Sequence, residues 1–83
     1  MDKNKYYKTN AFYLATFLLA KDFLLVSTER TSANKLIFVF ENTDKLQELV
    51  RIFNFGEINH VSLKVNFKKI EAAIKKLKSL IYD

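Results

Sequence analysis

The most regular pattern in the chain is a pair of apolar runs within residues 23–41 that flank a polar centre. In both runs, apolar residues and β-formers fill alternating positions, which is typical of β-strands. The polar centre, residues 30–34, is typical of a hairpin loop. The pattern predicts an antiparallel hairpin that is largely apolar on both faces. Because two strands alone are marginal in water, we expect helices on one face, and a third strand, a helix or a second copy elsewhere.

The segments around this hairpin have the composition of helices. The run AFYLATFLLAK from Ala11 is apolar nearly all round a helix, which predicts burial on several sides. Thr9 or Asn10 is positioned to cap it. A second helix is predicted after Asn42 or Thr43, with apolar residues at the spacing of one helical face.

The only glycine marks the end of this second helix. Gly56 follows Asn54 and Phe55, where a helix terminus commonly takes a left-handed residue. We therefore expect the helix to end at residues 54–55 and Gly56 to adopt a positive φ. The sequence thus predicts that Gly56→Val destabilises the fold through the backbone conformation.

Residues 57–65 allow two interpretations. Apolar residues alternate with Ser62 and Lys64, which predicts a short third strand. Alternatively, the last helix starts at Ser62. We favour the strand, because Asn66 is a good cap for the helix FKKIEAAIKKLKSLIY that follows.

These elements predict a small α+β domain in the order αββαβα. Its antiparallel sheet is built on the central hairpin and packed by helices. The domain is expected to span residues 9–83, after a basic, mobile lead-in at residues 1–8. The predicted core, shared with the first helix, consists of Phe38, Leu49, Phe53, Ile70, Ile74 and Leu77.

The composition shows a surplus of apolar residues and of lysine. Hydrophobic residues form 49% of the 83-residue chain, which suggests that some of them serve an interface. The net charge is +5, and 12 of the 14 basic residues are lysines. Lysines and tyrosines could form a basic surface for a single nucleic acid strand. The candidate residues for this surface are Lys3, Lys5, Tyr6, Tyr7, Lys8, Lys68, Lys69, Lys75 and Lys76.

The same residues also have ordinary structural explanations. Lysines on a helix usually form a solvated face, and the two tyrosines more often anchor a terminus against a core. Arginine, the residue that usually reads bases and phosphates with a planar fork, is scarce. Any binding to nucleic acid is therefore expected to be weak.

Catalytic chemistry has little support in the sequence. There is no cysteine, no glycine-rich phosphate loop and no recognisable pair of carboxylates. His60, the single histidine, has only Glu57 and Asn59 as polar neighbours in sequence, so a surface role is the default. We expect a protein that is not an enzyme and has no cofactor, metal or small-molecule substrate.

The apolar run at residues 11–20 bears on where the protein is located. After three lysines this run imitates a signal peptide, but no small-residue cleavage site follows and Lys21 and Asp22 interrupt it. It is also too short to span a bilayer. We expect a buried helix in a cytoplasmic protein that does not enter membranes.

Three stretches carry a resemblance to a known family: YYKTNAFYLATFLLAK, LIFVFENTDKLQELV and AAIKKLKSLIY. In their order they resemble a family of short uncharacterised domains of bacterial and phage genomes, classed as a domain of unknown function. The resemblance implies a small α+β unit and a phage or mobile-element origin, and it supplies no active site. A glycine that is usual in that family after the first helix is replaced here by Asp22-Phe23.

Two classes of function follow from these observations. The first is a structural or protein-interaction module that self-associates as a homodimer through the sheet face or edge, or through the first helix. The second is a small basic accessory protein that binds nucleic acid through lysines.

Overall fold

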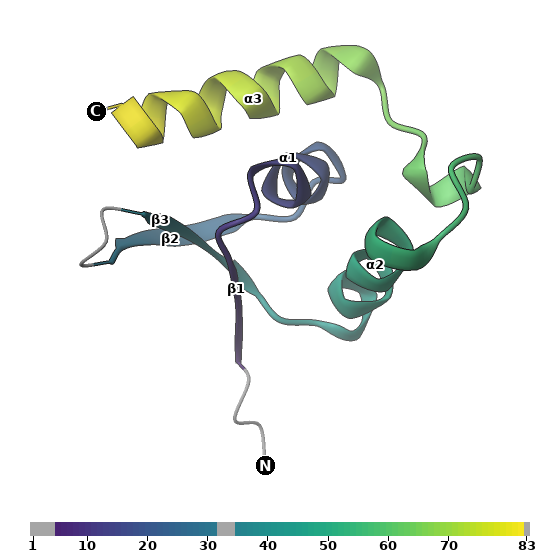
Figure 1. Cartoon of the computed structure of the whole chain (residues 1–83), viewed down its shortest axis with the longest axis horizontal. Coiled ribbons are helices and arrows are strands. Elements are labelled where there is room, and N and C mark those ends of the chain that lie inside the picture. Colours follow the sequence, from purple (N-terminus) through teal and green to yellow (C-terminus); the bar gives the residue numbers. More distant parts are fainter. Residues whose placement is uncertain (1–4, 32–34, 83) are drawn as a thin grey trace.

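Helix α1 (Phe12–Ala20) lies at the centre of the molecule, and the other elements surround it (Figure 1). The computed structural model describes residues 5–31 and 35–82. In chain order the elements are β1 (Tyr6–Thr9), α1, β2 (Leu25–Arg30), β3 (Leu36–Glu41), α2 (Asp44–Phe55), the 3-10 turn η1 (Val61–Leu63) and α3 (Phe67–Tyr82). The predicted α+β class is confirmed, with three helices and an antiparallel sheet of three strands in the described residues.

The sheet is built on the predicted hairpin. Strands β2 and β3 pair antiparallel from Leu25 opposite Phe40 to Arg30 opposite Leu36. The strand order is β1-β3-β2, so β3 is central and β2 is an edge. The predicted loop at residues 30–34 begins with the last residue of β2, and its centre, residues 32–34, lies outside the described residues.

The third strand is not the predicted one. It is β1, which pairs with β3 from Tyr6 opposite Glu41 to Thr9 opposite Phe38. Residues 6–8, assigned to a lead-in, therefore belong to the domain, and the order is β-α-β-β-α-α instead of αββαβα. The sequence YYKT has no alternation of apolar and polar residues that would predict a strand, and an alternation appears only in the burial of its side chains.

Residues 57–65 form neither of the two predicted elements. They contain η1, and α3 begins at Phe67, not at Ser62. A local turn replaces the strand: the Ser62 amide donates to Nδ1 of His60, and the Leu63 amide donates to the carbonyl of His60. The predicted cap Asn66 is confirmed, since its Oδ1 accepts from the amide of Lys68.

The first helix ends in a hydrogen-bonding pattern known as a Schellman motif. The amide of Phe23 donates to the carbonyl of Leu18, and the amide of Asp22 donates to that of Leu19. Such a motif requires a left-handed residue after the helix, and Asp22 has a φ of 74°. Asp22 therefore occupies a conformation that glycine would adopt at lower cost.

The two faces of the sheet are covered in different ways. Phe38 and Phe40 of β3 point towards the helices and join the core around α1. Val39 points away from the helices, yet it is only 3% exposed. Lys8 of β1 and Glu29 of β2 form an ion pair of 3.2 Å across the central strand, next to Val39. Their side chains cover part of this face in place of a helix.

The predicted core is partly confirmed. Phe38, Leu49 and Leu77 are buried, and Phe53 is half-buried with its ring 5.3 Å from that of Phe17. Ile70 and Ile74 are only half-buried, because the predicted apolar stripe of α3 is wider than its contact with α1. Burial of the first helix is also confirmed, with Leu14, Ala15, Phe17, Leu18 and Ala20 buried. The buried apolar side chains outside the prediction are Val39, Phe40, Leu46, Val50, Ile52 and Ala73.

The positive φ predicted at Gly56 is wrong. Gly56 has φ −72° and ψ 159°, an extended conformation that any residue adopts. The need for glycine is steric instead, because an added Cβ would lie 2.6 Å from the carbonyl oxygen of Ile52. The helix end at residues 54–55 and the cap Thr43, which accepts from the amide of Leu46, are confirmed.

Gly56→Ala is expected to destabilise the protein by about 1–3 kcal/mol, the usual cost of overpacking. Urea denaturation of the variant and the wild type measures this difference. Asn54→Ala, an exposed change on the neighbouring last turn, serves as control and should leave the midpoint nearly unchanged. A Gly56→Ala variant as stable as the wild type would contradict the steric argument.

Leu77→Ala is expected to cost about 2–5 kcal/mol, because the side chain is fully buried beside α1. Ile74→Ala, one turn earlier on the same helix, should cost clearly less because Ile74 is only half-buried. Thermal unfolding of both variants tests the order. An equal loss of stability in the two variants would show that the core extends further along α3.

Asp22→Gly is expected to stabilise the fold by about 0.5–1 kcal/mol, because it removes the cost of a left-handed Asp. The substitution also removes an ion pair with Lys69, but both side chains are at least half exposed and such pairs contribute little. Asp22→Asn is the control, since asparagine tolerates the same backbone and lacks the charge. A loss of stability in both variants would show that the carboxylate matters more than the backbone.

Candidate interaction surface

The predicted nucleic-acid residues at the start of the chain fall on two faces of the sheet. The register of β1 places Tyr6 and Lys8 on the face away from the helices, while Tyr7 points inwards and packs against the core. Lys8 is engaged by Glu29, and Lys5 lies 5.9 Å from the ring of Tyr6. Lys3 lies outside the described residues.

The other candidate lysines lie on α3, on the opposite side of the sheet from the face that carries Lys8 (Figure 1). Lys68 pairs with Glu71 at 3.3 Å, and Lys69 pairs with Asp22 at 2.6 Å. Lys75 and Lys76 are exposed. The structure therefore divides the predicted basic surface into two separate groups, and nearby carboxylates pair with three of its lysines.

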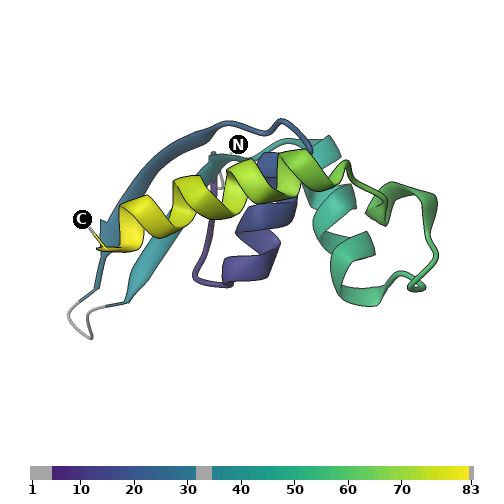
Figure 2. The same cartoon turned by 90° about the horizontal axis from the view of Figure 1, so that it is seen from above.

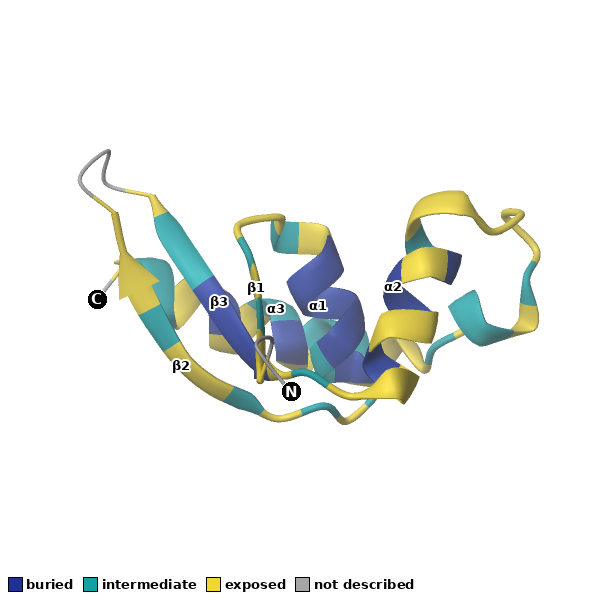
Figure 3. Cartoon of the chain, turned by 90° about the horizontal axis from the view of Figure 1, so that it is seen from below, coloured by how far each residue is buried: buried dark blue, intermediate teal, exposed yellow. Residues whose placement is uncertain are grey.

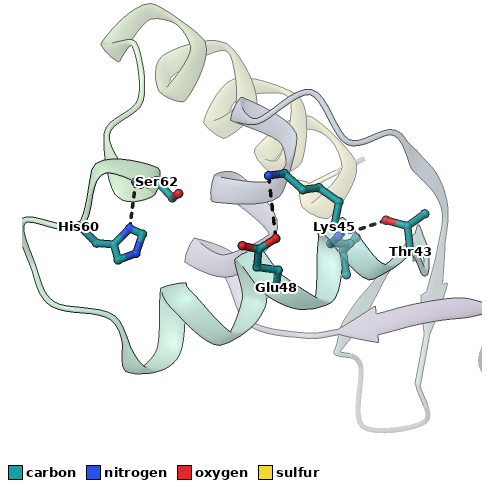
Figure 4. A network of polar contacts seen from close by, with 6 residues as sticks. Thr43, Lys45, Glu48, His60 and Ser62 are labelled. Carbon is teal, nitrogen blue, oxygen red and sulfur yellow. Dashed lines mark hydrogen bonds and ion pairs between the residues drawn. The ribbon is translucent and has the colours of Figure 1, made fainter.

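His60 has a structural contact. Its Nδ1 accepts from the amide of Ser62 at 3.0 Å and starts the turn η1 (Figure 4). The nearby ion pair in the same view joins Lys45 and Glu48 on α2 at 4.0 Å. Among the residues that the structure describes, no three His, Asp or Glu side chains lie close enough to hold a metal ion.

Two hollows flank the connection between α1 and β2. One has a volume of about 450 Å³ and is lined by Lys5, Tyr6, Asp22, Phe23, Leu24, Val26, Glu41 and Thr43. The other, of about 320 Å³, lies between this connection and α3 and includes Leu19, Lys69, Ala72 and Lys76. Both hollows share Asp22, Phe23 and Leu24, so the segment 22–24 forms a ridge between them.

Apolar side chains are exposed along this ridge and the start of β2. Leu24 is 81% exposed, Val26 is 50% exposed and Tyr6 is 45% exposed. Val26 is displaced because the pairing of β2 skips it, with Leu25 opposite Phe40 and Ser27 opposite Val39. We call Tyr6, Leu24 and Val26 the β2 patch. Leu24 and Val26 lie at the beginning of the edge strand β2 (Figure 3), and Tyr6 lies on β1, on the other side of β3.

A second group of exposed apolar residues lies on the connection from α2 to α3. Phe55, Ile58, Val61 and Phe67 are all more than 70% exposed. A shallow apolar hollow of about 220 Å³ lies between α1, α2 and the start of α3, and its lining includes Phe17, Phe53 and Ile70. The connection from α2 to α3 is at the end of the molecule far from the last residues of β2 and the first residues of β3 (Figure 2).

The sequence did not identify the β2 patch as a surface. Leu24 and Val26 were predicted as strand residues on covered faces, because the alternation of the hairpin is apolar on both sides. The apolar alternation on both faces of the hairpin is itself a sign of an interaction surface, because one of the two faces requires a further partner to cover it. The bulge that exposes Val26 has no marker in the sequence, because no glycine accompanies it.

None of the helices in the described part of the chain is both long and apolar enough to cross a membrane. The first helix, the most apolar one, has only nine residues.

Comparison with known proteins gives one match. The sequence model of the family described as domain of unknown function (DUF5659) matches residues 4–83. The chain therefore belongs to this family. No curated protein and no solved structure matches the chain.

Proposed function

We propose that this member of the DUF5659 family is a protein-interaction module that self-associates as a homodimer through the β2 edge and its apolar patch. The observation that carries the proposal is the exposure of Leu24 and Val26 beside an edge strand. Edge strands of monomeric proteins are usually shielded by charged side chains, proline, a bulge or a covering element. Strand β2 has no lysine or proline, and its two charged side chains are engaged within the chain, Glu29 by Lys8 and Arg30 by the carbonyl of Ile81. The bulge at Val26 is the one such device it has.

The energetics favour burial of this surface. Apolar area contributes roughly 25 cal/mol per Å² when it is removed from water, so a patch of a few hundred Å² supplies several kcal/mol before the costs of association. Of the alternatives from the sequence, the first helix is mostly buried within the monomer, and the outer sheet face carries the pair Lys8–Glu29. Of the two edges of the sheet, β1 carries Lys8 whereas β2 has no lysine, so the edge of β2 is the preferred candidate.

Nucleic acid binding is the alternative that the proposal ranks second. The net charge of +5 attracts phosphates, but the candidate lysines lie on opposite sides of the sheet and three of them have carboxylate partners. Phosphate contacts by dispersed lysines give weak binding that declines steeply with salt. In this proposal the lysines mainly keep the dimer soluble.

The proposal includes no catalytic step, cofactor or small-molecule substrate. A cytoplasmic location is part of the same proposal, in keeping with a small chain that lacks cysteine. A bacterial or phage origin is proposed from the resemblance alone.

Sedimentation velocity over a series of concentrations tests self-association, and Val26→Lys tests the surface. Lysine on an edge strand opposes pairing, so this variant is expected to sediment as a monomer at a concentration where the wild type is dimeric. Ile58→Lys is the matched control, since Ile58 is 90% exposed and lies on the connection from α2 to α3. This variant should dimerise like the wild type.

The possible outcomes separate the alternatives. A monomeric wild type at high micromolar concentration would refute self-association, and tight binding to single-stranded DNA at moderate salt would establish the second function in its place. If Ile58→Lys dissociates the dimer and Val26→Lys does not, the interface lies on the α2–α3 connection, and its assignment to the β2 patch is wrong.

A further inference from the structure

The backbone of β2 has one set of hydrogen-bonding groups directed away from the sheet. The amide of Thr31 donates to the carbonyl of Lys35, which fixes the alternation along the hairpin. Since hydrogen-bonded and non-hydrogen-bonded pairs alternate in antiparallel strands, Ser27 and Glu29 bond to β3. The amides and carbonyls of Thr28 and Arg30 therefore point outwards at the edge.

The space beside this edge is open. Strand β2 runs along the margin of the molecule, with α3 on the helix side of the sheet (Figure 2). The guanidinium of Arg30 donates to the carbonyl of Ile81, which holds this long side chain against α3 at 3.1 Å. No other strand in the described part of the chain pairs with β2 apart from β3.

The charges of β2 select one way for two copies to pair. A twofold axis at Thr28 places this residue opposite Thr28 of the second copy. Ser27 of each copy then lies opposite Glu29 of the other, and Val26 lies opposite Arg30. A threonine pair is favourable across strands, and no charge faces its like. Moving the axis to Glu29 would place two carboxylates face to face. Moving it to Ser27 would place Glu29 and Arg30 opposite Leu25 and Leu24, apolar residues on the far side of the bulge.

We infer that β2 pairs antiparallel with β2 of a second copy about a twofold axis at Thr28. This inference rests on the self-association proposed above and specifies its geometry. The two three-stranded sheets then form one sheet of six strands, in the order β1-β3-β2-β2-β3-β1. The bulge at Val26 bends the strand, so the new ladder is short and spans residues 26–30.

Cysteine cross-linking tests this register without background from native cysteines, because the chain has none. In a hydrogen-bonded antiparallel pair the Cα atoms are about 5.5 Å apart, within the range of a disulfide. Thr28→Cys is therefore expected to give a covalent dimer as the main product under mild oxidation. Arg30→Cys would place its two sulfurs four positions apart, roughly 13 Å along the strands, and should stay monomeric on a denaturing gel.

Further single cysteine substitutions serve as controls for the register of strand pairing and for cross-linking by random collision. Ser27→Cys and Glu29→Cys lie on the same strand and would cross-link best if the axis were at their own position. Ile58→Cys, on an exposed site far from β2, measures random encounters. Preferential cross-linking of Thr28→Cys over all of these supports the inference. Preferential cross-linking of Ser27→Cys or Glu29→Cys, or none above the Ile58→Cys level, overturns it.

Amide hydrogen exchange of the unsubstituted protein provides a second measurement. The amides of Thr28 and Arg30 should become protected as the concentration rises, while those of Ser27 and Glu29 should be protected at all concentrations. A dimer by sedimentation without protection of Thr28 would refute the β2 pairing and leave self-association intact. A monomer at every concentration would refute both.

Discussion

Burial of the first helix is the constraint on which the rest of the structure depends. Six of the nine residues of α1 are buried, including Thr16, whose hydroxyl donates to the carbonyl of Phe12. A helix with no polar face has to be enclosed on several sides. The sheet, α2 and α3 each cover one side, and none of them alone presents enough apolar surface to do so.

This central position also explains the local details at the ends of α1. The chain has to leave the helix and enter β2 within four residues, and the Schellman motif reverses its direction in that distance. Asp22 takes the left-handed position there, a conformation that glycine would adopt at lower cost. The tight connection then leaves Leu24 exposed as part of the ridge between the two hollows.

The sheet links this architecture to the proposed function. Its inner face is filled by Phe38 and Phe40, and its outer face is shielded by an ion pair across Val39, so neither face offers a large apolar surface. The edge formed by β2 is different. Its outward backbone groups pair with no strand in the described residues, Leu24 and Val26 beside them are at least half exposed, and β2 carries one positive and one negative charge. In a chain of net charge +5, such a neutral segment is where two copies repel each other least.

The sequence by itself determined the elements whose signals are local. The apolar alternation gave the hairpin, the capping residues Thr43 and Asn66 gave the helix starts, and the uniform apolarity of residues 11–20 gave a buried helix. These features depend on neighbours within a few positions, which is the range over which periodicity and capping act.

Only the tertiary structure decided which segment completes the sheet and which surfaces remain open. Residues 57–65 have an alternating pattern and residues 6–9 do not, yet it is residues 6–9 that reach the free edge of β3 and pair with it. Glu29 likewise meets Lys8 only because their strands lie on either side of β3. Such pairings join residues far apart in sequence, so the candidate surface at Tyr6, Leu24 and Val26 could not be assembled from local patterns alone.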